Sequence, residues 1–390
     1  MGFLLYKIFF KKYNSETIIS EEIININENQ LPVAQEGSRE KILDNPVENI
    51  LQLNSLSQFN ASEIAQGELT QTPAITNTSI SSPVLSADGN HLQYYNPEDN
   101  KFYKINENGQ ATILTNKIFY NIENIIWSSK KNKAILEYPD GANIIYDFFT
   151  NKQTTLPKHW KDFDFNPDSN KIVMKSIGID VDNRWLAVSN DDNSKTKIIE
   201  SLGTKDATVY PSWSPNNQTV AMYTQSIGLN KQELFFVGLN KENFKSIIIE
   251  GRGFQSQWSP NGNKLLYSIY SSNNNLKPSL WVVNAKGDNI GSGKKNLGVD
   301  TWSNKCTFNS NENIFCAIPE KLENGSGVFP ELAKNTSDNL YQINVLTGIK
   351  KLIAIPDGSY NIFNIIITKN KEYLYFTNGK TNKLHKVKLK

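Results

Sequence analysis

Seven segments of this chain repeat one arrangement of apolar and polar positions. In each, a large apolar residue precedes a short polar turn and a brief apolar run follows, as in Trp258–Asn263 (WSPNGN) followed by Lys264–Tyr267 (KLLY). Proline presets the backbone φ angle for such a turn, and asparagine and glycine tolerate its left-handed conformations. A turn of this kind between two apolar runs predicts a β-hairpin at the start of every segment.

The spacing of these hairpins predicts the architecture. The polar residues that open the turns are Ser86, Ser128, Asn166, Ser214, Ser259, Asn309 and Thr368. Successive members of this set are 42, 38, 48, 45, 50 and 59 residues apart. The residue before each one is apolar, and so is the residue six positions after it. A period in the forties is typical of the four-stranded blade of a propeller.

Further apolar runs supply the remaining strands of most segments. Third strands are predicted at 234–237, 280–283, 340–343 and 384–387, and outer fourth strands at 197–199, 246–249 and 351–354. An isolated four-stranded sheet leaves both faces uncovered, so neighbouring sheets must stack, and a closed ring leaves only short edges exposed. We therefore predict an all-β protein, a β-propeller of seven four-stranded blades.

The chain divides into three regions. The propeller is predicted at 67–390, behind an acidic polar linker at 15–66 that we expect to be largely disordered, and a short apolar and basic N-terminus at 1–14. The last segment has no fourth strand of its own after 383–390. We predict that the stretch around Glu68–Ile75 closes the ring by supplying this strand from the N-terminal side.

The repeated turns resemble those of a known group of proteins. The turns at 165–170 (FNPDSN) and 258–263, with third strands such as Leu280–Val283 (LWVV), resemble the TolB-type, WD-repeat-like bacterial propellers over residues 70–390. They also resemble the propeller domain of prolyl oligopeptidases, without its catalytic domain. The first and last segments depart from the pattern, with Leu85 and Ile367 in place of tryptophan. Such propellers serve as binding platforms, gating domains or enzymes, so the resemblance implies a fold and leaves function open.

The apolar stretch Gly2–Phe10 has two interpretations. It is far shorter than the ~20 residues of a membrane span and carries no cleavage site of the A-x-A type. It is either a few residues without a structural role or the remnant of a membrane anchor. The resemblance favours the anchor, because similar propellers are often exported or tethered behind an N-terminal span.

Several functional classes lack their sequence signature. The net charge is only +2, whereas nucleic-acid binding needs a concentrated basic stripe. A hydrolase nucleophile would need a G-x-S-x-G elbow, which is absent. The histidines are scattered without paired metal ligands at His91, His159 and His385. Asp180–Asn183 and Asn190–Asn193 lack the calcium-loop signature, and Gly291–Lys295 lacks the phosphate-loop frame. We predict no nucleic-acid partner, no metal and no cofactor.

The two cysteines, Cys306 and Cys316, flank one predicted hairpin turn centred near Asn311. This symmetry places them opposite each other on adjacent antiparallel strands, where Cα atoms are ~4.5 or ~5.5 Å apart. Both separations suit a disulfide, and an oxidising compartment follows if the bond forms. The alternative is a pair of buried free thiols that act as small apolar residues.

The long spacing of 59 residues arises from an insertion at 319–336, between the second and third strands of the sixth blade. Long loops on a rigid scaffold often carry function, and Val328, Phe329 and Pro330 would suit contact with a partner. The alternative is a lid that packs over the neighbouring blade.

These observations predict a non-catalytic platform that binds a protein, peptide or glycan partner through one propeller face. We expect a monomer in an extracytoplasmic location, in the periplasm or at the cell surface, with its N-terminus as a possible membrane tether. Free thiols would instead indicate the cytoplasm. The alternative function is a propeller-fold enzyme of the lyase or glycan-processing type, with ionisable side chains converging on the channel mouth.

Overall fold

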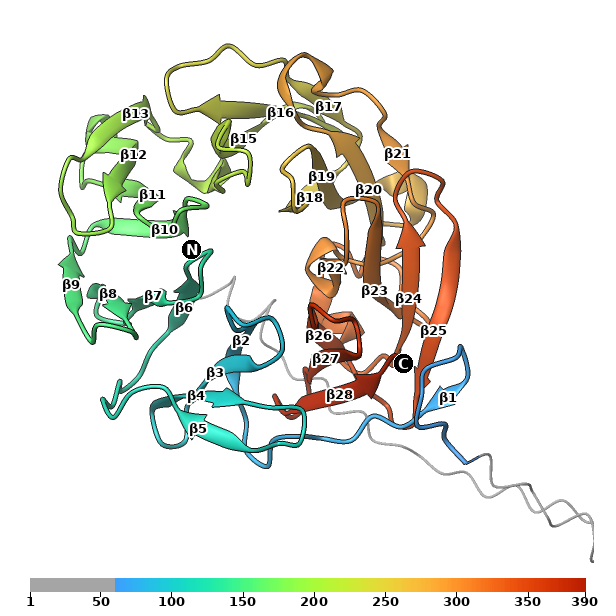
Figure 1. The fold of residues 1–390 in the computed structure, drawn as a ribbon. Coiled ribbons are helices and arrows are strands. Elements are labelled where there is room, and N and C mark those ends of the chain that lie inside the picture. The colour runs from blue at the N-terminus through green and yellow to red at the C-terminus, as the bar shows by residue number, and fades with distance from the viewer. Residues whose placement is uncertain (1–59) are drawn as a thin grey trace, which may run out of the picture. The chain divides into compact units, whose positions relative to one another are not determined.

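A computed structural model describes residues 60–390, whose antiparallel sheets are arranged in a ring (Figure 1). The predicted seven-bladed β-propeller is confirmed. The predictions for residues 1–14 and 15–59 lie outside the described residues. Within 60–390, no helix is long and apolar enough to span a bilayer.

The first four blades follow one another along the chain, each with its strands in sequence order. Blade 1 contains β2 (Ser81–Leu85), β3 (Leu92–Asn96), β4 (Lys101–Ile105) and β5 (Ala111–Ile113). Blade 2 contains β6 (Asn124–Trp127), β7 (Lys133–Glu137), β8 (Asn143–Asp147) and β9 (Gln153–Leu156). Blade 3 contains β10 (Trp160–Phe165), β11 (Lys171–Ile177), β12 (Arg184–Asn190) and β13 (Lys197–Ser201). Blade 4 contains β14 (Val209–Pro211), β15 (Thr219–Gly228), β16 (Lys231–Gly238) and β17 (Ile247–Ile249).

The remaining blades continue the ring and include its closure. Blade 5 contains β18 (Arg252–Trp258), β19 (Lys264–Tyr270), β20 (Pro278–Asn284) and β21 (Lys295–Asn296). Blade 6 contains β22 (Cys306–Phe308), β23 (Asn313–Pro319), β24 (Asp338–Asn344) and β25 (Lys350–Pro356). Blade 7 contains β26 (Ile362–Ile367), β27 (Tyr373–Asn378) and β28 (Leu384–Lys388). Short 3-10 turns lie at Val181–Asn183, Asp206–Thr208, Ser272–Asn274, Gly287–Asn289, Ser303–Lys305 and Pro330–Ala333.

The recurring polar residue has one structural role in most blades. Its side-chain oxygen accepts a hydrogen bond of 2.9–3.2 Å from the backbone N–H five residues later at Ser128, Asn166, Ser214, Ser259 and Thr368. These five side chains are at most 4% exposed, and a buried polar group needs such a partner. Serine, asparagine and threonine meet this need, which explains why these residue types recur at the turn.

The hydrophobic core lies between the blades. Leu234 of blade 4 belongs to one buried cluster with Leu265 and Tyr267 of blade 5, and Ile343 of blade 6 belongs to another with Leu266 of blade 5. Each blade therefore covers its neighbour, as the burial argument for a ring requires.

The N-terminal segment closes the ring across two blades, which differs in detail from the predicted single strand. The short strand β1 (Leu69–Thr70) pairs in parallel with β25, so it extends blade 6 as a fifth strand. Farther along, Ile75 N donates to Leu384 O and Lys386 N donates to Pro73 O, which gives blade 7 its outer edge. The blue N-terminal segment beside β25 and β28 shows this path in Figure 1.

Candidate functional site

Each face of the ring carries its own set of loops, because successive strands in a blade run in opposite directions. The loops that join second to third strands, and those that lead from one blade to the next, emerge together on what we call the 2–3 face. The repeated hairpin turns, together with the links from third to fourth strands, lie on the opposite face, which we call the hairpin face.

The insertion at 319–336 lies on the 2–3 face, since it joins β23 to β24 as predicted. One side of it is attached to blade 5. Gly325 N donates to Asn275 O at 2.9 Å and Gly327 N donates to Leu276 O at 2.8 Å. A Cβ atom at Gly327 would lie 2.5 Å from the Cβ of Tyr270, so the close approach of the two loops requires glycine there. The insertion is thus fixed to its neighbouring blade.

The other side of the insertion is held by a buried polar cluster of Lys305, Asp338 and Asn361, which we call the clamp. The Asn361 side-chain N–H donates to the carbonyl oxygens of Ala333 and Lys334, both at 3.1 Å. Lys305 Nζ donates to Asn361 Oδ1 at 2.8 Å and to Asp338 Oδ2 at 2.6 Å. The clamp therefore joins blades 6 and 7 to the end of the insertion.

Burial dominates the electrostatics of the clamp. Lys305 is 2% exposed and Asp338 is 1% exposed. Loss of solvation lowers the pKa of Lys305 and raises that of Asp338, while the attraction between the two charges opposes both shifts. The ammonium group also lies 4.8 Å from the ring centre of Phe363. Because these groups already have protein partners, the geometry indicates a positioning role and not a free acid or base.

A pocket of about 350 Å³ opens between the insertion and the inner strands of blades 5 and 7. We call it the rim pocket. Its lining combines aromatic, aliphatic and polar side chains, including Gln255, Trp302, Asn304, Pro330, Glu331 and Phe363. Ligand sites of this size commonly combine apolar walls with a few hydrogen-bonding groups. Pro330, which the sequence predicted as a partner-contact residue, thus lines a concave pocket.

Exposed apolar side chains continue from the insertion across the 2–3 face. Val328, Phe329 and Leu332 of the insertion are 37%, 55% and 41% exposed. Leu276, in the blade 5 loop that is bonded to the insertion, is 38% exposed, and Leu229, at the tip of the β15–β16 hairpin, is 91% exposed. We call these five residues the apolar row. Exposed apolar residues that gather on joined loops of one face are typical of interaction surfaces.

The loops that carry the apolar row are joined to one another. Asn230, next to Leu229 at the tip of the blade 4 hairpin, donates from its side chain to Ser272 Oγ of blade 5 at 3.0 Å. The blade 5 loop is bonded in turn to the insertion, as described above. The apolar row therefore lies on one connected support across blades 4, 5 and 6.

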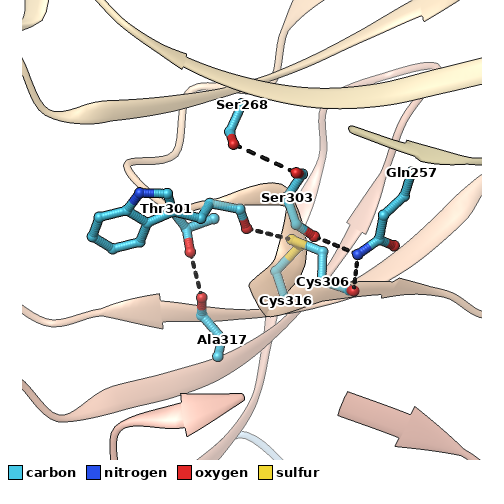
Figure 2. The surroundings of a disulfide bond; sticks show 8 residues. Gln257, Ser268, Thr301, Ser303, Cys306, Cys316 and Ala317 are labelled. Carbon is cyan, nitrogen blue, oxygen red and sulfur yellow. Dashed lines mark hydrogen bonds between the residues drawn. A yellow bond between two sulfur atoms is a disulfide. The ribbon is translucent and has the colours of Figure 1, made fainter. Parts of the chain in front are cut away.

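The disulfide follows directly in sequence on Lys305, which lines the rim pocket. Cys306 and Cys316 are direct cross-strand partners on β22 and β23, with Cα atoms 4.1 Å apart and their sulfur atoms bonded (Figure 2). Gln257 of blade 5 donates from Nε2 to Cys306 O at 3.0 Å and to Ser303 O at 2.7 Å. Since Lys305 immediately precedes Cys306, the bond restrains the chain that carries the clamp and the pocket wall.

The other candidates from the sequence lie apart from this site. His91 contacts Asp88 on the hairpin face, and buried His385 bonds Thr72 O and stacks on Phe376. His159 lies beside Trp160, at the entry to blade 3. Among residues 60–390, no three His, Cys, Asp or Glu side chains gather closely enough to hold a metal ion.

The acidic and glycine-rich loops have local partners. Asp192 accepts from Ser194 N at 3.0 Å, and Asp191 pairs with Lys133. Asn284 donates to Ser292 Oγ at 3.0 Å within the turn at 291–295. The contacts of Asp192 and Asn284 are those of inter-strand turns, and the pair of Asp191 with Lys133 joins blade 3 to blade 2.

Comparison with known proteins shows similarity in structure only. No family model matches the chain, and no curated protein matches it in sequence. An oligogalacturonate lyase in complex with manganese superposes with a TM-score of 0.56 at 14% identity, covering 82% of this chain and 93% of the lyase. The chain has the fold of a seven-bladed β-propeller. The propeller domain of Myceliophteria thermophila Cps50 (Swd1) gives 0.54 at 11% identity, covering 82% and 100%. A prolyl endopeptidase gives 0.51 at 11%, covering 80% of this chain and 50% of that protein.

Proposed function

We propose that this propeller is a non-catalytic platform that binds a protein, peptide or glycan partner through its 2–3 face. The observation that carries the proposal is the insertion, which is bonded on one side to blade 5 and on the other to the clamp. A loop held on both sides presents the apolar row and the rim pocket in a preformed shape, which lowers the entropic cost of binding. Val328 and Phe329 are the residues that we expect to make the central contacts.

The same proposal includes an extracytoplasmic location. It is supported by the cross-strand cysteine pair, because a disulfide persists in an oxidising compartment. The apolar N-terminal sequence at 2–10 is consistent with a membrane tether, which would leave the propeller to act as a monomer near the envelope.

An enzymatic alternative has one observation in its favour, the structural likeness to oligogalacturonate lyases. At 12–14% identity this likeness concerns the fold. The ionisable pair beside the rim pocket is engaged in the clamp, which favours the binding platform. Incubation with oligogalacturonate tests the alternative directly, because a lyase would release unsaturated oligosaccharides and a platform would not.

The binding proposal is tested by photo-crosslinking in the native host. A photoreactive phenylalanine replaces Phe329 in one variant and Phe149 in a matched control, because Phe149 is 88% exposed and lies on the hairpin face. We expect a discrete adduct from position 329 only. The partner identified in that adduct is then titrated against the purified Val328→Ser/Phe329→Ser variant, with an expected loss of at least tenfold in affinity. Equal adducts from both positions, or an unchanged affinity, would contradict the proposal.

A further inference from the structure

The outer edge of blade 4 is only partly covered. The third strand of the blade, β16, has eight residues and pairs along its length with β15. On its other side it pairs with β17 at only three positions, Gln232, Glu233 and Leu234. In the described chain no strand adds to the outer edge of 235–238. In blade 2, by contrast, β9 covers four of the five residues of β8.

A groove of about 390 Å³ lies along this open edge. Side chains alternate between the two faces of a strand, so Phe235 and Val237 point to one side of the blade and Phe236 to the other. The consecutive residues 235–238 all line the groove, together with Phe244 from the link to β17. Because the Phe236 side chain is buried in the core cluster with blade 5, the groove follows the backbone edge of this part of the strand. It therefore occupies the place where a longer fourth strand would lie.

Neighbouring elements form the walls of the groove and leave the outer edge of 235–238 uncovered. Glu200 and Ser201, at the end of β13 in blade 3, line the far wall. Tyr223 stacks on Phe235 with ring centres 4.6 Å apart, which gives one side a flat aromatic floor. The link from β16 to β17 turns back on itself, because the Glu242 carboxylate accepts from Asn240 N at 2.7 Å.

We propose that this groove binds an extended peptide segment, which adds to β16 as a strand. An unpaired strand edge offers backbone donors and acceptors that an extended peptide satisfies and a hydrocarbon ligand cannot. Four residues of open edge, about 13 Å long, match a short β-strand. The stacked rings of Tyr223 and Phe235 select apolar side chains on that side of the bound strand. This site shares no lining residue with the rim pocket or the apolar row, and it goes beyond the proposed function.

The test uses peptides displayed on phage as the probe. A random heptapeptide library is panned on the purified chain and counter-selected on Ser201→Trp, which fills the groove from an exposed position. The control is Thr112→Trp, at an exposed position of the outer strand β5 in blade 1. We expect a selected synthetic peptide to bind the parent chain and Thr112→Trp equally, and Ser201→Trp at least tenfold more weakly.

Hydrogen exchange then distinguishes strand addition from binding elsewhere. Peptide binding is expected to slow amide exchange within 235–238 and to leave the insertion at 319–336 unchanged. The Val328→Ser/Phe329→Ser variant should bind the peptide normally, so that failure of the platform proposal and failure of this one give different results. The proposal would be overturned if no selected peptide bound the parent chain more tightly than Ser201→Trp. It would also be overturned if peptide binding slowed amide exchange only outside 235–238.

Discussion

Replacement of Lys305 by methionine tests whether the clamp positions the insertion. Methionine retains much of the side-chain volume but removes the ammonium group, which donates to Asp338 at 2.6 Å and to Asn361 at 2.8 Å. Asp338 would keep one hydrogen bond, from Ile362 N at 2.6 Å to Oδ2, while its Oδ1 has no partner. The substitution therefore leaves a buried carboxylate without its counter-charge.

The expected loss of unfolding free energy is about 3–5 kcal/mol, the range for breaking a buried pair by removing one partner. The double variant Lys305→Met/Asp338→Asn has no uncompensated charge at this site. The amide oxygen introduced at position 338 can still accept the hydrogen bond from Ile362 N. We expect this double variant to recover most of the loss. Lys158→Met is the matched control, because it breaks an exposed pair with Asp140 that is 67% and 64% accessible. An exposed pair contributes little, so the control should unfold like the parent chain.

Urea unfolding measures these differences, and amide exchange at 330–334 reports whether the insertion has loosened. Lys305→Met is expected to lower the unfolding midpoint and to speed exchange in that segment. The double variant should recover most of the midpoint, whereas exchange should stay fast because Asn361 still lacks its bond from Lys305. If Lys305→Met unfolds like Lys158→Met, the buried pair does not support the fold. If the double variant is no more stable than the single one, the loss did not come from an uncompensated charge.

Two further predictions concern the disulfide and one carboxyl group that is partly buried. Cys306→Ser/Cys316→Ser opens a link across ten positions of sequence, which should lower the unfolding free energy by about 3 kcal/mol in urea titrations; two free thiols in protein trapped from the native host would refute the oxidised pair. Burial raises the pKa of Asp164 to about 6, against hydrogen bonds from Trp213 N and Phe165 N that favour the carboxylate. The folded state then binds this proton more tightly than the unfolded chain, so the contribution of Asp164 to stability is complete below about pH 4 and is lost as pH rises through 6. Carboxyl ¹³C NMR of Asp164 should show a midpoint near 6, and a midpoint below 4 would contradict the burial argument.

The blades were predictable because their signals are local. A hairpin turn between apolar runs is encoded within about ten residues, and side chains such as Ser214 and Ser259 bond a backbone N–H only five positions away. The predicted outer strand at 351–354 falls inside the observed β25, and the one predicted at 246–249 begins one residue before β17. The location of the insertion between β23 and β24 was predicted from the spacing of 59 residues between the last two turns.

The clamp and the ring closure were not predictable, because both depend on contacts between distant positions. Lys305, Asp338 and Asn361 come from three separate strands or loops, and none stands in a distinctive local pattern. The N-terminal segment was expected to serve one blade, yet Leu69 pairs with Ile355 of blade 6 before the chain reaches blade 7. An alternating pattern shows that a segment forms a strand, and it does not show which of two adjacent sheet edges the strand will join.

Both proposed sites occur where the chain departs from the repeat. A complete blade covers its neighbour and leaves short, protected edges, so a perfect repeat offers little to a ligand. Blade 6 departs by a long insertion, which is fixed by the close approach at Gly327 and by the clamp and which forms one wall of the rim pocket. In blade 4 the fourth strand pairs with only three of the eight residues of β16, which leaves 235–238 open beside an aromatic groove. An insertion adds side chains for recognition, whereas a missing strand exposes backbone groups, so the two sites should select different chemistry. On this reasoning, one propeller can bind a partner at the 2–3 face and a peptide at the blade 4 edge at the same time.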